Sequence, residues 1–183
     1  MTAQAGSAAQ TGSTALASVS GSTLISDDGV GPISTKTNPK ADMKALFPGV
    51  DMQHREAEDF SMDTYTVFDG SHRSLVGIAD DEGKSFFKIT VYSPSYSTAE
   101  GVSTSSTVSD LVEKYPDLTC KYETYDPNPE NFTEALFCET HRYKHVSFHL
   151  DAGKWHGKPG KVAPHKLASR TLSSILWVPK PSN

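Results

Sequence analysis

The chain has 183 residues, a formal net charge of −5 and a mixed distribution of acidic and basic side chains. This length allows one domain or two small ones. The acidic balance argues against nucleic-acid binding, which needs a basic face. No apolar stretch approaches the ~20 residues of a membrane-spanning helix.

Residues 1–26 carry no charged side chain and consist mostly of Ala, Ser, Thr, Gly and Gln. Such a segment has too few large apolar groups to offset the entropy cost of ordering it. It also lacks the positive start and compact apolar stretch of a signal peptide. We expect residues 1–26 to be a disordered low-complexity tether, either a native tail or the start left after an export signal is removed.

Two segments of the chain resemble each other. Residues 29–48 and 101–116 both open on Gly-Val, pass through a Ser/Thr-rich stretch to an Asp, and end on an aromatic residue followed by Pro. Further on, KITVYSP at 88–94 matches SSILWVP at 173–179. Repeats of this kind predict a tandem duplication.

The first unit is expected to begin with a helix. Asn38-Pro39 is typical of an N-cap followed by proline at the first helical position, and Pro48 should end the helix near Phe47. Alternating apolar residues then predict a hairpin and a further strand. Their expected apolar positions are Tyr65 and Val67, then Leu75, Val76 and Ile78, then Phe87, Ile89 and Val91.

The second unit repeats this order. Thr107 is a candidate N-cap, and Asp110 three residues later mimics a capping box. Pro116 ends the helix. Strands are expected around 134–140, 143–150 and 171–178, with Leu172, Leu176 and Val178 on one face of the last strand and Ile175 and Trp177 on the other.

These patterns predict an α+β fold with a boundary near residue 98. We expect a first αβββ repeat at 27–98 and a second at 99–183, with the helices packed on one face of an antiparallel sheet. No alternating βαβ pattern and no Gly-rich phosphate loop occurs.

Cys120 and Cys138 lie in the second unit and flank a predicted hairpin. A bridge between them would close a loop of about 18 residues, worth roughly 3 kcal/mol on the chain-entropy model. We expect a structural disulfide in an oxidising compartment. The alternative is two buried free thiols in a cytosolic protein.

Four motifs carry a resemblance to a known family: GVGPI at 29–33, LFPG at 46–49, SPxYxTxxGV at 93–102 and WxP at 177–179. With them, roughly residues 25–180 resemble the bacterial envelope-stress-regulated lipoprotein family, a domain of unknown function. That family has no assigned catalytic residues.

The resemblance implies a periplasmic protein tethered to the outer membrane through an N-terminal lipid anchor. The chain departs from it in having no lipobox cysteine, so the anchor is absent from this chain. The repeated plan also looks like the β-lactamase inhibitor protein fold, an exported duplication. Repeats of that kind form a concave sheet that suits protein binding, although fold alone does not establish function.

The segment 151–170 is the candidate binding site. It is about ten residues longer than the matching connection near 80–84 and has no acidic side chain after Asp151. Expanded loops on a rigid scaffold often carry function, and Trp and Arg are typical interface anchors. We expect it to meet an acidic partner or an anionic surface; alternatively, it is a solubilising loop whose Trp caps the sheet. The candidate residues are Lys154, Trp155, His156, Lys158, Lys161, Lys166 and Arg170.

His145 and His149 are the strongest candidates for metal ligands, but the expected distance between them is too long for both to bind one ion. The alternation around them predicts a strand, along which residues four apart lie about 13 Å from each other. Zinc needs its ligands at about 2 Å. We expect no metal and no cofactor.

These observations favour a non-enzymatic envelope protein that binds a protein or another envelope component and has no catalytic residues. The first alternative is a periplasmic inhibitor or immunity factor that blocks an exported enzyme. The second is a cell-wall hydrolase, because Glu56, Glu58 and Asp59 lie in one loop; no G-x-S-x-G motif is present.

Overall fold

The computed structural model describes residues 22–48, 52–55, 62–80, 83–125 and 133–179. Within these ranges the chain is mostly strand, with two α-helices and short 3₁₀ turns. The strands are β1 (Leu24–Ser26), β2 (Gly29–Val30), β3 (Ile33–Ser34), β4 (Met52–Arg55), β5 (Thr64–Asp69), β6 (His72–Ala79), β7 (Phe86–Val91), β8 (Ser97–Thr98), β9 (Thr119–Tyr125), β10 (Thr133–Glu139), β11 (Val146–Leu150), β12 (Gly160–Val162) and β13 (Leu172–Trp177).

Both helices begin where their capping residues predict. Helix α1 (Pro39–Leu46) starts after Asn38, whose side chain accepts a hydrogen bond from the Ala41 amide. Helix α2 (Val108–Lys114) starts after Thr107, which forms a capping box with Asp110. Each cap satisfies amides that would otherwise lack a partner in the first turn.

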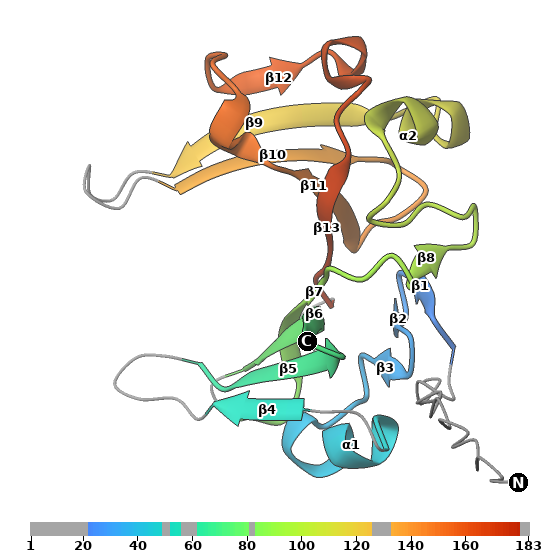
Figure 1. Cartoon of the computed structure of the whole chain (residues 1–183), viewed down its shortest axis with the longest axis vertical. Coiled ribbons are helices and arrows are strands. Elements are labelled where there is room, and N and C mark those ends of the chain that lie inside the picture. The colour runs from blue at the N-terminus through green and yellow to red at the C-terminus, as the bar shows by residue number, and fades with distance from the viewer. Residues whose placement is uncertain (1–21, 49–51, 56–61, 81–82, 126–132, 180–183) are drawn as a thin grey trace, which may run out of the picture.

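Most strands belong to one large sheet. Its order is β12-β9-β10-β11-β13-β7-β6-β5-β4, and the strands that follow α1 and α2 meet where β7 pairs antiparallel with β13. In Figure 1 this sheet runs from β12 to β4 through the middle of the molecule. The architecture is therefore mixed α+β, and the sheet continues across the boundary expected near residue 98.

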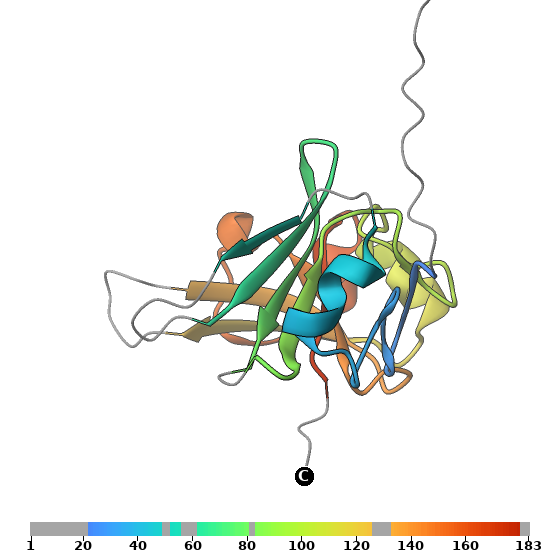
Figure 2. The same ribbon diagram turned by 90° about the horizontal axis from the view of Figure 1, so that it is seen from below.

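A second, four-stranded sheet has the order β3-β2-β1-β8. It lies beside α1 in both Figure 1 and Figure 2. Strand β1 pairs antiparallel with β2 and parallel with β8. Ile25 in β1 is fully buried, so the predicted tether of residues 1–26 extends too far: Leu24–Ser26 belongs to the fold because its apolar residues pair across the turn. Residues 1–21 lie outside the described residues.

The strands after α1 differ from the expectation in their number and in which side chains face the core. The described residues form four strands between α1 and β8 instead of the expected three, and the additional strand is β4. The prediction that Phe87 faces the core is wrong, because its side chain is 51% exposed while that of Phe86 is buried. The register shifts between Ile78 and Ala79, and Ala79 faces Phe86. Such an irregularity reverses which side chains face the core.

The last strand shows the same effect. Ile175 and Trp177 are fully buried, and Leu172 is buried with them. The register shifts between His149 and Leu150, so that Ser174 faces His149 while Leu172 faces Leu150. Leu172 was expected on the opposite face from Ile175, and the shift explains why it is not.

The disulfide joins Cys120 to Cys138, as expected. These residues face each other on β9 and β10, with their Cα atoms 4.0 Å apart. Both side chains are buried in the core. The bridge therefore fixes the pairing of two strands in the second half of the sheet.

Candidate functional site

The segment 151–170 folds into an extra strand with a turn on either side. It contains the 3₁₀ turn Ala152–Lys154, strand β12 and the 3₁₀ turn Pro164–Leu167. Strand β12 pairs antiparallel with β9 and forms one edge of the large sheet. Its end is tied to α2, because the Val108 and Ser109 amides donate to the carbonyls of Arg170 and Ala168. The insertion is therefore an integral part of the sheet.

Trp155 points inward rather than into solvent. Its side chain is half-buried and packs against the core. The Tyr122 ring lies edge-on at 6.5 Å, and the Arg170 guanidinium lies 5.7 Å from the indole centroid. The indole Nε1 is buried with no hydrogen-bond partner in the described part of the chain. These contacts support the alternative in which Trp155 caps the sheet.

The basic residues of the segment lie around this packed indole. His156, Lys158, Lys161 and Lys166 are exposed. Arg170 is half-buried and donates a hydrogen bond of 2.8 Å to the Asp151 carbonyl. The side chain of Lys154 is outside the description. The exposed lysines make no ion pair within the described residues, so they present free positive charge along the β12 edge.

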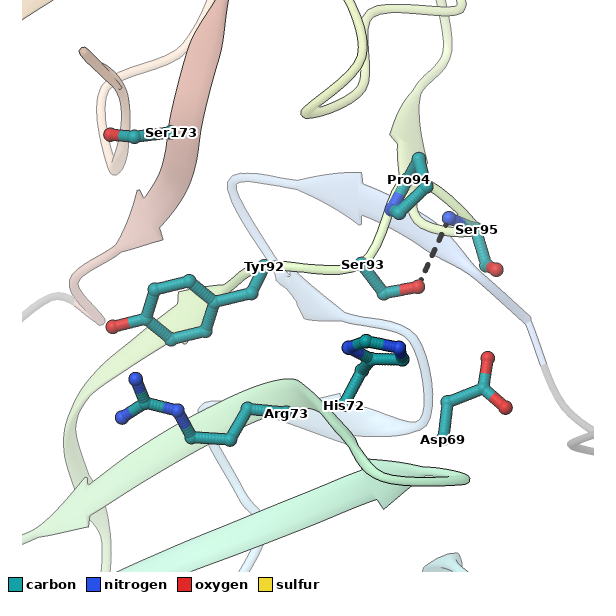
Figure 3. A pocket seen from close by; sticks show the side chains of 8 residues that line it. All are labelled: Asp69, His72, Arg73, Tyr92, Ser93, Pro94, Ser95 and Ser173. Atoms are coloured by element: carbon teal, nitrogen blue, oxygen red, sulfur yellow. Dashed lines mark hydrogen bonds between the residues drawn. The ribbon is translucent and has the colours of Figure 1, made fainter. Parts of the chain in front are cut away.

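A separate cavity of about 520 Å³ opens beside the central strands (Figure 3). Asp69 lines it from the end of β5, and His72 and Arg73 line it from the start of β6. The chain that leaves β7 forms another wall, and Ser173 of β13 completes the lining. The remaining lining residues are Tyr92, Ser93, Pro94 and Ser95.

Hydrogen bonds fix the wall that follows β7. The Tyr92 and Ser93 amides both donate to the Ser74 carbonyl, at 2.9 and 3.1 Å. The Ser95 amide donates to Ser93 Oγ at 3.2 Å, the dashed line in Figure 3. The Arg73 guanidinium lies 5.3 Å from the Tyr92 ring centroid, within cation–π range.

Sequence reasoning missed this cavity. The lining residues come from the β5–β6 hairpin, the end of β7 and the start of β13. The only local signal was the matched pair of segments at 88–94 and 173–179, which was interpreted as a sign of duplication. Their approach depends on the β7–β13 pairing, which a local pattern does not reveal.

Glu100 is the centre of a polar cluster. Its carboxylate accepts hydrogen bonds from Tyr143 at 2.6 Å, from Tyr115 at 3.0 Å and from Arg142 Nε at 3.1 Å. Burial acts to raise the pKa of Glu100, but these hydrogen bonds and one from the backbone outweigh it and lower the pKa to about 2. Burial, with Glu100 nearby, also raises the pKa of Tyr115 and of Tyr143.

His149 is the second strongly perturbed group. Its ring stacks on Phe137 at 5.5 Å, and its Nε2 lies 2.9 Å from Ser147 Oγ. Desolvation lowers the pKa of His149 to about 4, although the Glu139 charge opposes the shift. At neutral pH the imidazole is therefore uncharged.

Two kinds of feature are absent from the described residues. No group of three or more His, Cys, Asp or Glu side chains there could hold a metal ion. None of the helices described has the length and apolar character needed to span a bilayer. The loop acids Glu56, Glu58 and Asp59 lie outside the described residues.

Comparisons with known proteins identify a family but no activity. A family model described as "Protein of unknown function (DUF1131)" matches residues 13–179. The chain is also similar to the crystal structure of the uncharacterized protein yfeY from Escherichia coli, with a TM-score of 0.59 and 20% identity. That alignment covers 85% of this chain and 99% of the other, and it shows a shared fold. No curated protein matches the chain.

Proposed function

We propose that this chain, which belongs to the DUF1131 family, is a non-enzymatic domain of the cell envelope that acts by binding. We propose that it lies in the periplasm and is tethered to the outer membrane by an N-terminal lipid anchor. The Cys120–Cys138 disulfide supports an oxidising compartment. The resemblance to envelope lipoproteins supports the tether.

The scaffold of the proposed domain is a tandem duplication with its helices packed on one face of the sheet, as in the β-lactamase inhibitor protein. The strand order supports this. Strands β7-β6-β5-β4 run outward from the centre in one half, and β13-β11-β10-β9 run outward in the other. Each set follows one helix along the chain. The unit is then αββββ, one strand longer than the sequence indicated.

The exposed lysines of the insertion carry the proposal of binding. The insertion, from which Lys158, Lys161 and Lys166 project, has no counterpart among the described residues of the first half. They are free of ion pairs among the described residues, so no internal salt bridge has to break when they meet a negative surface. A basic patch near an anionic membrane contributes about 1 kcal/mol per lysine. The favoured ligand is therefore an anionic surface of the envelope.

The test is co-sedimentation with phosphatidylglycerol vesicles. The triple variant Lys158→Gln, Lys161→Gln, Lys166→Gln should bind about 100-fold more weakly, because three charges of about 1 kcal/mol each are lost. High salt should weaken binding by the unaltered protein, since screening shortens the reach of the charges. Phosphatidylcholine vesicles should not bind.

A matched control comes from the first half of the chain. Lys36, Lys40 and Lys44 are also exposed and lie near α1. Changing all three to glutamine removes the same net charge, yet should leave vesicle binding near that of the unaltered protein. Equal loss in both triple variants would show that net charge alone drives binding, and unchanged binding in the insertion variant would contradict the proposal.

A further inference from the structure

We infer that the cavity in Figure 3 binds a short peptide with two charged ends, its carboxylate at Arg73 and its ammonium group at Asp69. This site is separate from the basic insertion. It is independent of the proposed vesicle binding, so either proposal can fail alone. Four observations support the inference: a cation and an anion that form no ion pair with the described residues, a set of hydroxyl groups, and the size of the cavity.

Arg73 supplies the cationic end. Its side chain is exposed and makes no ion pair with any described residue. It is nevertheless held in place, because the guanidinium lies 5.3 Å from the Tyr92 ring centroid. A guanidinium held against an aromatic face keeps its N–H groups at the edge, where they can grip a carboxylate with two parallel hydrogen bonds.

Asp69 supplies the anionic end. It lies on the same hairpin as Arg73, where Asp69 faces His72 and Phe68 faces Arg73. Figure 3 shows Arg73 at one end of the lining, Asp69 at the other and His72 between them. No ion pair joins the two charged side chains. Two opposite charges that share a cavity without pairing suit a ligand that carries both charges itself.

Three serines, Ser93, Ser95 and Ser173, also line the cavity. Ser93 Oγ accepts from the Ser95 amide, which leaves its own proton free to donate. Ser173 Oγ donates to the His149 carbonyl at 3.2 Å, which leaves its oxygen free to accept. Ser93 Oγ can thus donate a hydrogen bond to the carbonyl group of a bound peptide.

The volume favours a peptide over a single ion. About 520 Å³ lies within the range of roughly 300–1,000 Å³ that is typical of small-ligand sites. A cavity of about 210 Å³ lined by Glu139, Lys144 and His145 also carries opposite charges, but its lining has no Arg and no Tyr, Phe or Trp. It provides a control site on the same molecule.

The test is a titration of the protein with unblocked tri-alanine, followed by amide chemical shifts in the NMR spectrum. We expect saturable shifts confined to the β5–β6 turn, the segment after β7 and the start of β13. Arg73→Gln and Asp69→Asn should each weaken binding at least tenfold, because each removes one charge-assisted contact. Lys144→Gln should bind as the unaltered protein does.

Blocked peptides assign each end. N-acetylated tri-alanine lacks the ammonium group, so it should bind weakly and equally to the unaltered protein and to Asp69→Asn. C-amidated tri-alanine lacks the carboxylate and should not distinguish the unaltered protein from Arg73→Gln. This pairing separates the proposed contacts from a general effect of either substitution on the fold.

Three outcomes would overturn the inference. One is the absence of shifts at 10 mM tri-alanine. Another is binding that neither Arg73→Gln nor Asp69→Asn weakens. The third is saturable binding of phosphoethanolamine without binding of the peptide, which would assign the cavity to a lipid headgroup instead.

Discussion

A single carboxylate, Glu100, joins three parts of the second half of the chain. It lies between β8 and α2, while Tyr115 ends α2 and Tyr143 precedes β11. The Tyr115 ring also stacks on Phe148 at 5.6 Å, so the polar cluster continues into the core. A carboxylate that accepts several hydrogen bonds is stabilised in its charged form. These contacts give Glu100 a structural role, because they hold the three parts of the chain together.

Changing Glu100 to Gln should lower the free energy of unfolding by about 2 kcal/mol at pH 7, because hydrogen bonds to a charged acceptor are weakened together. The pH dependence should change as well. The pKa of Glu100 is about 2 in the folded protein and below its ordinary value. The ionised Glu100 side chain thus contributes to the free energy of unfolding above about pH 5, and this contribution is lost as the pH falls toward 2.

Urea unfolding between pH 2 and pH 7 measures both effects. The variant should show a shallower loss of stability on acidification than the unaltered protein. Glu113→Gln is the control, since the Glu113 side chain is 72% exposed and, among the described residues, its carboxylate pairs with Lys114 alone. An equal response in both variants would mean that the Glu100 cluster contributes no more than a surface ion pair.

At the scale of elements, the insertion 151–170 protects the edge of the sheet. Strand β12 covers β9, and it is only three residues long. Pro159 precedes it, Pro164 follows it, and Lys161 lies on it. Short length, proline and lysine at an edge all discourage pairing with another chain. Trp155 holds this cover in place through Tyr122 and Arg170.

Trp155→Ala should therefore lower the free energy of unfolding by about 2 kcal/mol, less than for a fully buried tryptophan. Trp155→Phe should cost less than half as much. It keeps an aromatic ring against Arg170 and removes the buried Nε1 that has no hydrogen-bond partner among the described residues. Thermal unfolding of both variants provides the measurement. A large loss of vesicle binding without loss of stability would show instead that Trp155 is an interface anchor.

The elements that carry local signals were predicted well. Asn38 and Thr107 bind the first turns of their helices through their own side chains, so their effect is visible in sequence. Strand β4 was missed because MQHR has no apolar alternation. The Phe86–Phe87 register was missed because a neighbouring strand imposes it. The cavity was missed for the same reason, since pairing between distant strands brings its residues together.

At the scale of the whole molecule, Asp27 ties the N-terminal segment to the end of the chain. Its Oδ1 accepts hydrogen bonds from the Lys144 and His145 amides, at 2.7 and 2.8 Å. Its carbonyl accepts one from the indole of Trp177, which is fully buried. Strand β1, which ends at Ser26, also pairs with β8, the strand that ends at the expected boundary. The two halves therefore share contacts as well as a sheet.

Because these contacts span the halves, we expect the described fold to unfold in one cooperative step. Asp27→Ala should lower the free energy of unfolding by about 2 kcal/mol, since it leaves two amides without their acceptor. Asp28→Ala is the matched control. The Asp28 side chain is exposed, so this substitution should lower the free energy of unfolding by less than about 0.5 kcal/mol. Tryptophan fluorescence and circular dichroism followed during urea unfolding should coincide for the unaltered protein. Separate transitions would show that each half folds alone, in which case Asp27 would stabilise only the contact between them.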